Sequence, residues 1–160
     1  MHPNVRTVQD ALADAGAVDG SGSPSVVRVL EGAVTTAAAA ADALSVTVGQ
    51  IANSLIFSAD GEPLLVMTSG AHRVNTKKVA AGLGLAALDR ATPDFVRDHT
   101  GQAIGGVAPV GHPKPLRTLV DTALAGYDEI WAAGGIPHAV FPTTYAELVR
   151  LTGGTPTDVA

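Results

Sequence analysis

Residues 51–68 read IANSLIFSADGEPLLVMT, and this stretch decides the fold. Two apolar runs, residues 51–58 and 63–68, flank the dipeptide Asp60-Gly61. Asp-Gly readily adopts the positive φ angles of a tight two-residue turn, so the pattern predicts a β-hairpin. The chain on either side must then supply further strands and the helices that cover them.

Helix signals alternate with short β-prone runs along the rest of the chain. Each expected helix follows a residue that can cap its N-terminus: Asn4, Thr35 or Thr36, Asn75, Thr92 and Thr144. Strands are expected at residues 25–30, 116–120, 129–133 and 140–141. Scattered helices between strand pairs predict an α/β fold with a mixed sheet, and not a doubly wound parallel one.

The bulk composition predicts a single domain over residues 1–160. A chain of 160 residues can build one core but is too short for two ordinary domains. With 46% hydrophobic and 16% charged residues it is not disordered, and no apolar run approaches the ~20 residues that a membrane span needs. The N-terminus lacks a secretory pattern, so we expect a cytoplasmic protein with no membrane partner.

Several chemistries are excluded or weakened by the sequence. The chain has no cysteine, which excludes disulfides, thiolate metal sites and a cysteine nucleophile. Its five histidines are spread without H-E-x-x-H spacing and no serine lies in a G-x-S-x-G elbow, so we expect neither a metal ion, a cofactor nor an activated serine. The net charge of −5 predicts that any RNA contact is local.

Two glycine-rich segments could bind a ligand through their backbone. Residues 82–87, GLGLAA, match the dinucleotide fingerprint in letters, but they end an expected helix instead of opening one after a strand. Residues 100–111, TGQAIGGVAPVG, lie between an expected helix and an expected strand. This second loop can aim successive backbone N–H groups at one point, which suits a carbonyl oxygen that gains negative charge. A plain connection is the alternative interpretation.

Four segments occur in the order and style of the YbaK/ProX/EbsC proteins, and the chain therefore resembles that family, most strongly over residues 36–154. The four segments are residues 50–57 (QIANSLIF), 69–80 (SGAHRVNTKKVA), 91–93 (ATP) and 100–111. The resemblance implies a mixed, partly barrel-like sheet flanked by helices. It also implies trans-editing, the hydrolysis of the ester that joins a wrong amino acid to the 3′ end of a tRNA. Mischarged tRNA and prolyl-tRNA synthetase are the implied partners, and the working form is either a monomer or a homodimer.

The resemblance also implies a catalytic loop. In such proteins the G-x-x-x-P loop, here Gly105 to Pro109 and including Ala108, holds the ester carbonyl, and Gly106 and Val107 are the N–H donors that transfer to this chain. No side-chain nucleophile is visible, so water assisted by the substrate's ribose hydroxyl is the expected attacking group. Asn53 stands where the family has a characteristic lysine, and it can hydrogen-bond an oxygen but carries no charge.

Further binding residues are expected on both sides of this loop. His138, after the pair Gly134-Gly135, would contact the aminoacyl group, with an exposed or core histidine as the alternative. The densest basic cluster, Arg73, Lys77 and Lys78 with His72 in the same turn, would contact acceptor-stem phosphates, with solvated surface charges as the alternative. Because of Asn53, a catalytically impaired module that binds aminoacyl-tRNA or a synthetase is a second hypothesis for the whole chain.

Overall fold

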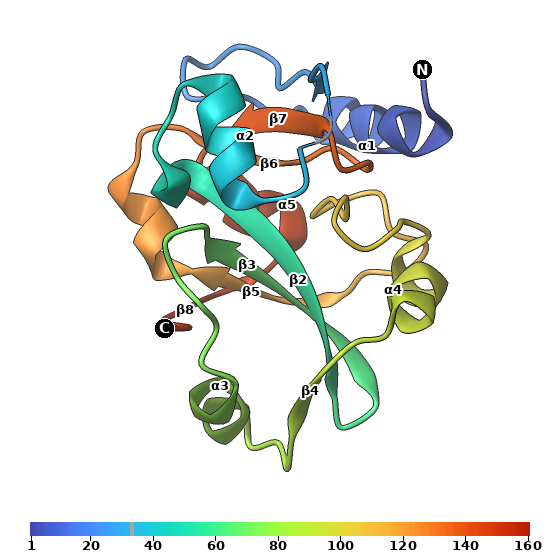
Figure 1. The fold of residues 1–160 in the computed structure, drawn as a ribbon, viewed down its shortest axis with the longest axis vertical. Helices are drawn as coiled ribbons and strands as arrows, with labels where there is room; N and C mark the ends of the chain where they lie inside the picture. The colour runs from blue at the N-terminus through green and yellow to red at the C-terminus, as the bar shows by residue number, and fades with distance from the viewer. Residues whose placement is uncertain (33) are drawn as a thin grey trace.

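The predicted hairpin lies at the centre of the structure. The computed structural model describes residues 1–32 and 34–160 (Figure 1). Strands β2 (Ile51–Ala59) and β3 (Glu62–Ser69) pair antiparallel along their whole length. The turn residues Asp60 and Gly61 have φ angles of 51° and 92°, as a tight turn of this type requires.

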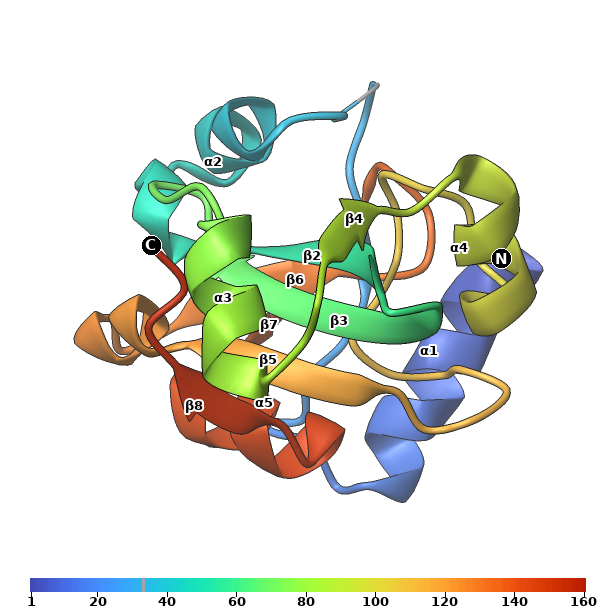
Figure 2. The same cartoon turned by 90° about the horizontal axis from the view of Figure 1, so that it is seen from below.

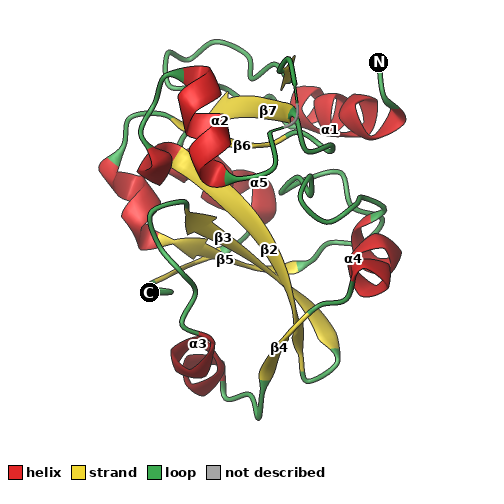
Figure 3. Ribbon diagram, viewed as in Figure 1, coloured by secondary structure: helices red, strands yellow, loops and turns green. Residues whose placement is uncertain are grey.

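A mixed sheet is built outward from the hairpin, which confirms the predicted fold class. Its strand order is β1-β7-β6-β2-β3-β5-β8, and β4 pairs with β2 outside this path. The added strands are β1 (Arg28–Val29), β4 (Leu88–Arg90), β5 (Arg117–Asp121), β6 (Ile130–Ala133), β7 (Ala139–Thr143) and β8 (Thr155–Thr157). Three pairings, β2 with β6, β3 with β5 and β5 with β8, are parallel, and the others are antiparallel. Figure 3 shows the helices arranged around this sheet.

Most helices begin at the cap residue that the sequence predicts. They are α1 (Pro3–Asp14), α2 (Ala37–Leu44), α3 (Thr76–Leu83), α4 (Pro93–Thr100), α5 (Tyr145–Thr152) and the short 3-10 helices η1 (Val48–Gln50) and η2 (Thr122–Gly126). The side chains of Thr36, Asn75, Thr92 and Thr144 accept hydrogen bonds from the first turns of α2, α3, α4 and α5. Helix α1 differs, because His2 and not Asn4 caps it.

Helices cover the two faces of the sheet unequally. The large core contains Val8 and Leu12 of α1 and Leu148 of α5, together with one face of β2 through Ala52 and Ile56. On the other face, α2 packs over Ile51 and α3 packs over Phe57 in two separate buried clusters. Figure 1 shows α2 beside the first residues of β2 and α3 toward the other end of the strand, and Figure 2 shows α3 in front of the sheet. The middle of this face of β2 therefore has less helical cover than its ends.

One local prediction needs correction and another is confirmed. The expected strand at residues 25–30 forms only over Arg28–Val29, because the Ser25 hydroxyl donates to the Pro142 carbonyl and the Val27 N–H donates to the Gln9 side chain. The segment 82–87 ends α3, with Gly84 as the left-handed C-cap, and then leads into β4. This placement lacks the strand-to-helix turn that a dinucleotide fingerprint requires.

Candidate functional site

Strand β2 has an unpaired edge in its middle. On the edge away from β3, β6 pairs with Ile51 and Ala52, and β4 pairs with residues Phe57 to Ala59. Within the part of the chain that the structure describes, residues 53–56 have only β3 as a neighbour. The Ile51 carbonyl accepts from Gly70 N–H on the β3 side, and backbone groups of a strand alternate between its two edges. Ser54 and Ile56 therefore direct their N–H and C=O groups to the unpaired edge.

The glycine-rich loop between α4 and β5 lies beside this part of β2 (Figure 1). The side chains of Val107 and Ala108 are 3% and 0% exposed and belong to the same core as Ala52 and Ile56. Val107 and Ala108 thereby anchor this part of the loop in the core.

The two adjacent glycines of the loop are required for different reasons. Gly105 has a φ angle of +91°, which side-chain-bearing residues rarely adopt, and a Cβ there would meet no atom within 4 Å. A Cβ on Gly106 would lie 2.5 Å from the Ile136 carbonyl carbon and 2.7 Å from the Pro137 nitrogen. Gly106 thus allows the loop backbone to rest directly on the backbone that leads to His138.

The backbone donors of the loop are not equally free. The Gly106 N–H donates to the Ala103 carbonyl at 3.1 Å, so Gly106 is not the free donor that the sequence analysis assigned. The Ala108 N–H donates to Gln102 Oε1 at 2.7 Å, and Pro109 has no N–H. Among the described residues, the N–H groups of Gly105 and Val107 have no hydrogen-bond acceptor in the protein.

Gln102 and His112 hold the loop from behind, and neither was singled out from the sequence. Gln102 is 2% exposed, and its own N–H donates to the Thr100 hydroxyl at the end of α4. His112 Nε2 lies 2.7 Å from the Ala108 carbonyl oxygen, which can only accept, so Nε2 carries the proton. Burial lowers the pKa of the His112 imidazole, and its bond to the Ala108 carbonyl acts in the opposite direction.

Two cavities lie behind the loop and share Gly111 and His112. One, of about 290 Å³, is bordered by α1, α5 and the segment 109–116. The other, of about 360 Å³, lies between α1 and the segments 100–102 and 111–113. The first cavity reaches Pro109 at the end of the predicted catalytic loop, but neither cavity includes Asn53 or His138.

Asn53 belongs to the sparsely covered face of β2. Strand side chains alternate between faces, so Asn53 and Leu55 share the face of Ile51 and Phe57, opposite the core that receives Val107. Asn53 is half-buried, and Leu55 is 37% exposed although it is a large apolar residue. The structure therefore places Asn53 at the unpaired part of β2 but on the other face from the side chains that anchor the loop.

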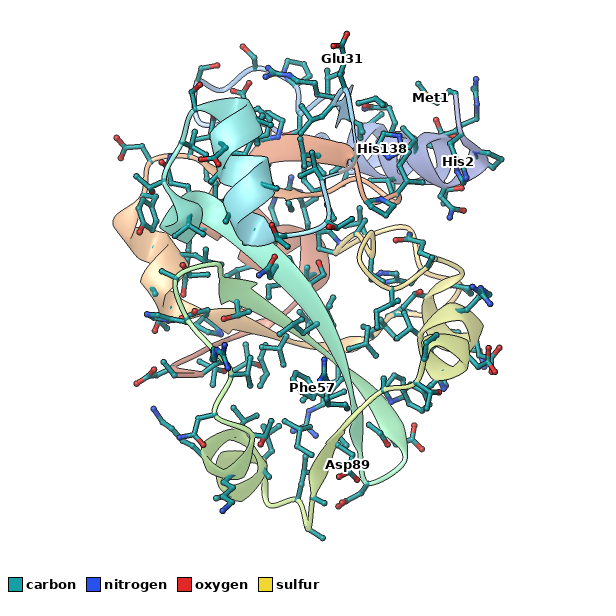
Figure 4. The ribbon with its side chains drawn as sticks, in the orientation of Figure 1. Met1, His2, Glu31, Phe57, Asp89 and His138 are labelled. Carbon is teal, nitrogen blue, oxygen red and sulfur yellow. The ribbon has the colours of Figure 1, made fainter. Side chains whose placement is uncertain are left out.

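The segment after β6 combines a close-packing glycine with a partly exposed histidine. A Cβ on Gly135 would lie 2.8 Å from the Asn4 carbonyl oxygen, so Gly135 faces α1. The absence of a side chain at Gly135 therefore allows this turn to pack directly against α1, while a contact of Gly135 with substrate stays a prediction. His138 is half-buried in the turn before β7, and its carbonyl accepts from the Leu30 N–H. Figure 4 shows His138 beside α1, at the opposite end of the sheet from Phe57 and Asp89.

The basic cluster divides into paired and exposed members. His72 Nδ1 lies 3.0 Å from Asp121 Oδ2, and this carboxylate is buried at 1% exposure. Lys78 Nζ lies 2.9 Å from Asp158 Oδ2 and also donates to the Ala160 carbonyl. The hydrogen bond from Lys78 to the Asp158 carboxylate lowers the pKa of Asp158. Arg73 and Lys77 are exposed and form no salt bridge with any described residue.

Residues 1–32 and 34–160 contain neither a candidate metal site nor a helix that could span a membrane. No group of three or more His, Asp or Glu side chains is arranged to hold a metal ion. No helix in this part of the chain combines the length and the apolar character needed to cross a bilayer.

Comparisons with known proteins identify relatives over most of the chain. A sequence model of the family described as "Aminoacyl-tRNA editing domain" matches residues 31–151. A crystal structure of a protein whose proposed role is trans-editing for prolyl-tRNA synthetase matches with a TM-score of 0.90 and 41% identity, covering 99% of this chain and 98% of that one. The crystal structure of hypothetical protein APE2540 matches with a TM-score of 0.83 and 26% identity, covering 96% and 98% of the two chains.

Curated sequences add two kinds of relative. Proline–tRNA ligase of Nitratidesulfovibrio vulgaris (strain DP4) is 36% identical over 91 residues, which are 57% of this chain and 16% of the ligase. The uncharacterized protein YwhH of Bacillus subtilis (strain 168) is 28% identical over 123 residues, which are 76% of this chain and 78% of YwhH. The chain thus spans about 16% of the length of the ligase and most of the length of YwhH.

Proposed function

The chain belongs to the aminoacyl-tRNA editing domain family, and on that premise we propose that it hydrolyses the ester between a wrongly attached amino acid and the 3′ end of a tRNA. The reaction would be carried out in trans, without a covalent intermediate on the protein. Likeness to a structure with a proposed trans-editing role and to part of a proline–tRNA ligase supports tRNA charged by prolyl-tRNA synthetase as the first substrate to test.

The observation that carries this proposal is the Val107 N–H. It lies between two peptide groups that are already hydrogen-bonded within the protein, in a part of the loop where Val107 and Ala108 are buried in the core. A fixed donor costs no reorganisation when negative charge develops on a carbonyl oxygen, which is the electrostatic basis of an oxyanion hole. The Gly105 N–H, two residues earlier, is the second candidate donor.

The proposed reaction needs no group beyond water and the substrate. A water oxygen attacks the ester carbonyl carbon, the carbonyl oxygen takes up negative charge beside Val107, and the bond to the ribose oxygen then breaks. The water proton passes to the departing ribose oxygen, with the neighbouring ribose hydroxyl as relay. Placing the two reactants in one orientation supplies part of the rate enhancement.

The unpaired edge of β2 offers the complementary contacts. The free backbone groups of Ser54 and Ile56 can receive the polar groups of the aminoacyl-adenosine end. Asn53 can hydrogen-bond a ribose or phosphate oxygen there, and Arg73 and Lys77 can contact phosphates further along the acceptor stem. His138 would border the aminoacyl group, because the next two residues before it, Ile136 and Pro137, touch Gly106.

A deacylation assay tests the proposal directly. Purified protein is incubated with tRNA for proline charged with proline, alanine, serine or cysteine, and with matched non-proline tRNAs, and the loss of ester is followed against buffer. We expect faster ester loss for at least one small amino acid other than proline. The enzyme proposal would be abandoned if no acyl group were released faster than in buffer.

A second candidate function is supported by Asn53. A neutral amide stands at the position of the family's characteristic lysine, so the site lacks one positive charge near the proposed nucleotide end. A protein with this change could bind aminoacyl-tRNA or a synthetase without hydrolysis. Binding of charged tRNA together with no ester loss in the same assay would favour this candidate.

A further inference from the structure

Ala108 is held through both of its backbone polar groups. Its N–H donates to Gln102 Oε1 and its carbonyl accepts from His112 Nε2, each at 2.7 Å. Gln102 is in turn connected to α4, because its N–H donates to the Thr100 hydroxyl at 3.0 Å and that hydroxyl donates to the Val96 carbonyl at 2.7 Å. The loop is thereby connected by hydrogen bonds to a helix on one side and to His112 on the other.

These bonds restrict the peptide group on which the reaction would depend. The Val107 N–H belongs to the peptide between Gly106 and Val107. The preceding peptide is fixed by the Gly106 N–H bond to Ala103, and the following one by the Ala108 N–H bond to Gln102. With both neighbouring peptide planes fixed, little rotation remains for the Val107 N–H.

The Gln102 side chain has a property that a purely space-filling role does not explain. Its amide orientation is set by the Ala108 N–H, which requires an oxygen, so Nε2 must point elsewhere. Nε2 is buried and has no hydrogen-bond partner among the described residues. An unpaired buried donor is destabilising, and an apolar side chain of similar size would avoid this cost. What the apolar side chain could not supply is the acceptor for Ala108.

We propose that Gln102 and His112 are positioning residues for ester hydrolysis, and that they act by clamping Ala108 so that the Val107 N–H is aimed at the oxyanion. This inference rests on the proposed function. Neither side chain touches the substrate, and each acts through the loop backbone. Small errors in the position of a donor are costly, since a displacement of about 1 Å can reduce a rate by roughly 100-fold.

Paired variants of each residue test the clamp. Gln102→Leu removes the acceptor for Ala108, whereas Gln102→Glu keeps an oxygen at that position. His112→Leu removes the donor, whereas His112→Gln can place an amide N–H near the position of Nε2. We expect each leucine variant to lower kcat by about 10-fold or more with KM changed less than about threefold, because the donor acts on the transition state. Each conservative variant should recover most of the loss.

A matched control separates positioning from loss of stability. Thr143 is also fully buried and its Oγ1 also lacks a hydrogen-bond partner among the described residues, but it belongs to β7, where it pairs with Ile130 of β6. Thr143→Val should leave kcat and KM within about twofold of wild type. Unchanged kcat in both leucine variants, or an equal loss of kcat in Thr143→Val, would overturn the proposal. If Gln102→Leu does not fold, the two His112 variants provide the same comparison.

Amide hydrogen exchange provides a readout that does not depend on activity. The Ala108 N–H should be protected in the wild type and in Gln102→Glu, and should exchange at least about 10-fold faster in Gln102→Leu. If the wild type hydrolyses no charged tRNA, the proposed function fails while the exchange data still decide whether Gln102 holds the loop. Equal exchange rates in all three proteins would overturn the clamp itself.

Discussion

The Gln102 Oε1 atom lies 2.7 Å from the backbone nitrogen of Ala108, and both residues are buried in the protein interior. A side chain six residues upstream therefore fixes the centre of a glycine-rich loop. Two adjacent glycines usually leave a loop conformationally free. Here the glycines permit the required φ angles, and hydrogen bonds to the loop backbone then restrict its movement. The consequences for substitution follow from this combination.

The two glycines of the loop should respond differently to alanine. In Gly106→Ala the new Cβ must displace the backbone of Ile136 and Pro137, so we expect a loss of about 1–3 kcal/mol in the free energy of unfolding and a large drop in kcat. In Gly105→Ala there is space for the methyl group, and only the cost of a left-handed residue remains, about 1–2 kcal/mol. Denaturant unfolding and deacylation kinetics measure both. A larger loss of kcat in Gly105→Ala would contradict the assigned backbone contact.

The exposed and paired basic residues should contribute unequally to tRNA binding. Substituting Arg73 and Lys77 together by alanine should weaken binding and reduce the salt dependence of log Kd by a slope of about 1–2, with kcat little changed. Lys78→Ala removes the same type of charge, but this lysine is already bound to Asp158 and the Ala160 carbonyl. Titration of charged tRNA at several salt concentrations distinguishes them, and an equal effect of Lys78→Ala would argue against a site at Arg73 and Lys77.

Stability should fall as the pH is lowered below the usual pKa of histidine, in part because of His112. Burial lowers the pKa of His112 in the folded protein, so the unfolded chain takes up the proton first as the pH falls. This contribution to stability is complete above the unfolded pKa of about 6.5 and is lost as the pH falls through the lowered folded pKa. Unfolding experiments between pH 8 and 5 should show a smaller pH slope in His112→Gln.

A second acid-sensitive contact connects α5 to the segment after α1. Glu147 accepts two hydrogen bonds from Arg150 and one from the Val18 N–H, and the bond from Arg150 is the main cause of its lowered pKa. The contribution of Glu147 to the free energy of unfolding is present above the usual carboxyl pKa and is lost as the pH falls through its lowered pKa in the folded protein. Glu147→Gln should therefore be less stable than wild type at pH 7 and closer to it near pH 3. Thermal unfolding at both pH values tests this, and a constant difference would refute it.

Asn53→Lys distinguishes the two candidate functions. A lysine at this half-buried position on β2 would restore the positive charge that the family resemblance leads one to expect. A large gain in kcat/KM would indicate that the natural site is impaired, whereas a loss would indicate that the amide is the working group. Asn53→Asp, which is similar in size but negative, should weaken binding of charged tRNA in either case.

Much of the fold could be predicted because its signals are local. The caps at Thr36, Asn75, Thr92 and Thr144 and the turn at Asp60-Gly61 each depend on residues close in the sequence. Strands β4 and β8 were missed, since each has only three residues and forms only when a distant strand pairs with it. The Ser25 hydroxyl bond to the Pro142 carbonyl, at the start of the expected strand at residues 25–30, is equally remote in sequence, and the observed strand begins only at Arg28.

The sequence predicts which loop forms the candidate site, but it does not predict the contacts that hold the loop in place. Glycine and proline spacing indicates where the backbone can approach a ligand, and the family resemblance indicates which loop is involved. No local pattern reveals that Gly106 uses its N–H for Ala103 or that Gln102 is buried. His72 pairs with Asp121, 49 residues further along the chain, and Lys78 pairs with Asp158, 80 residues further along. Neither pairing can be inferred without the three-dimensional structure.

The direct contact of Gly106 with Ile136 and Pro137 joins two segments thirty residues apart without any intervening side chain. Neither segment can be exchanged alone for that of a relative with a different backbone path, because no rotamer change could absorb the mismatch. Chimeras intended to redirect amino-acid preference should transplant both segments as one unit, or alter only the side chains at their border.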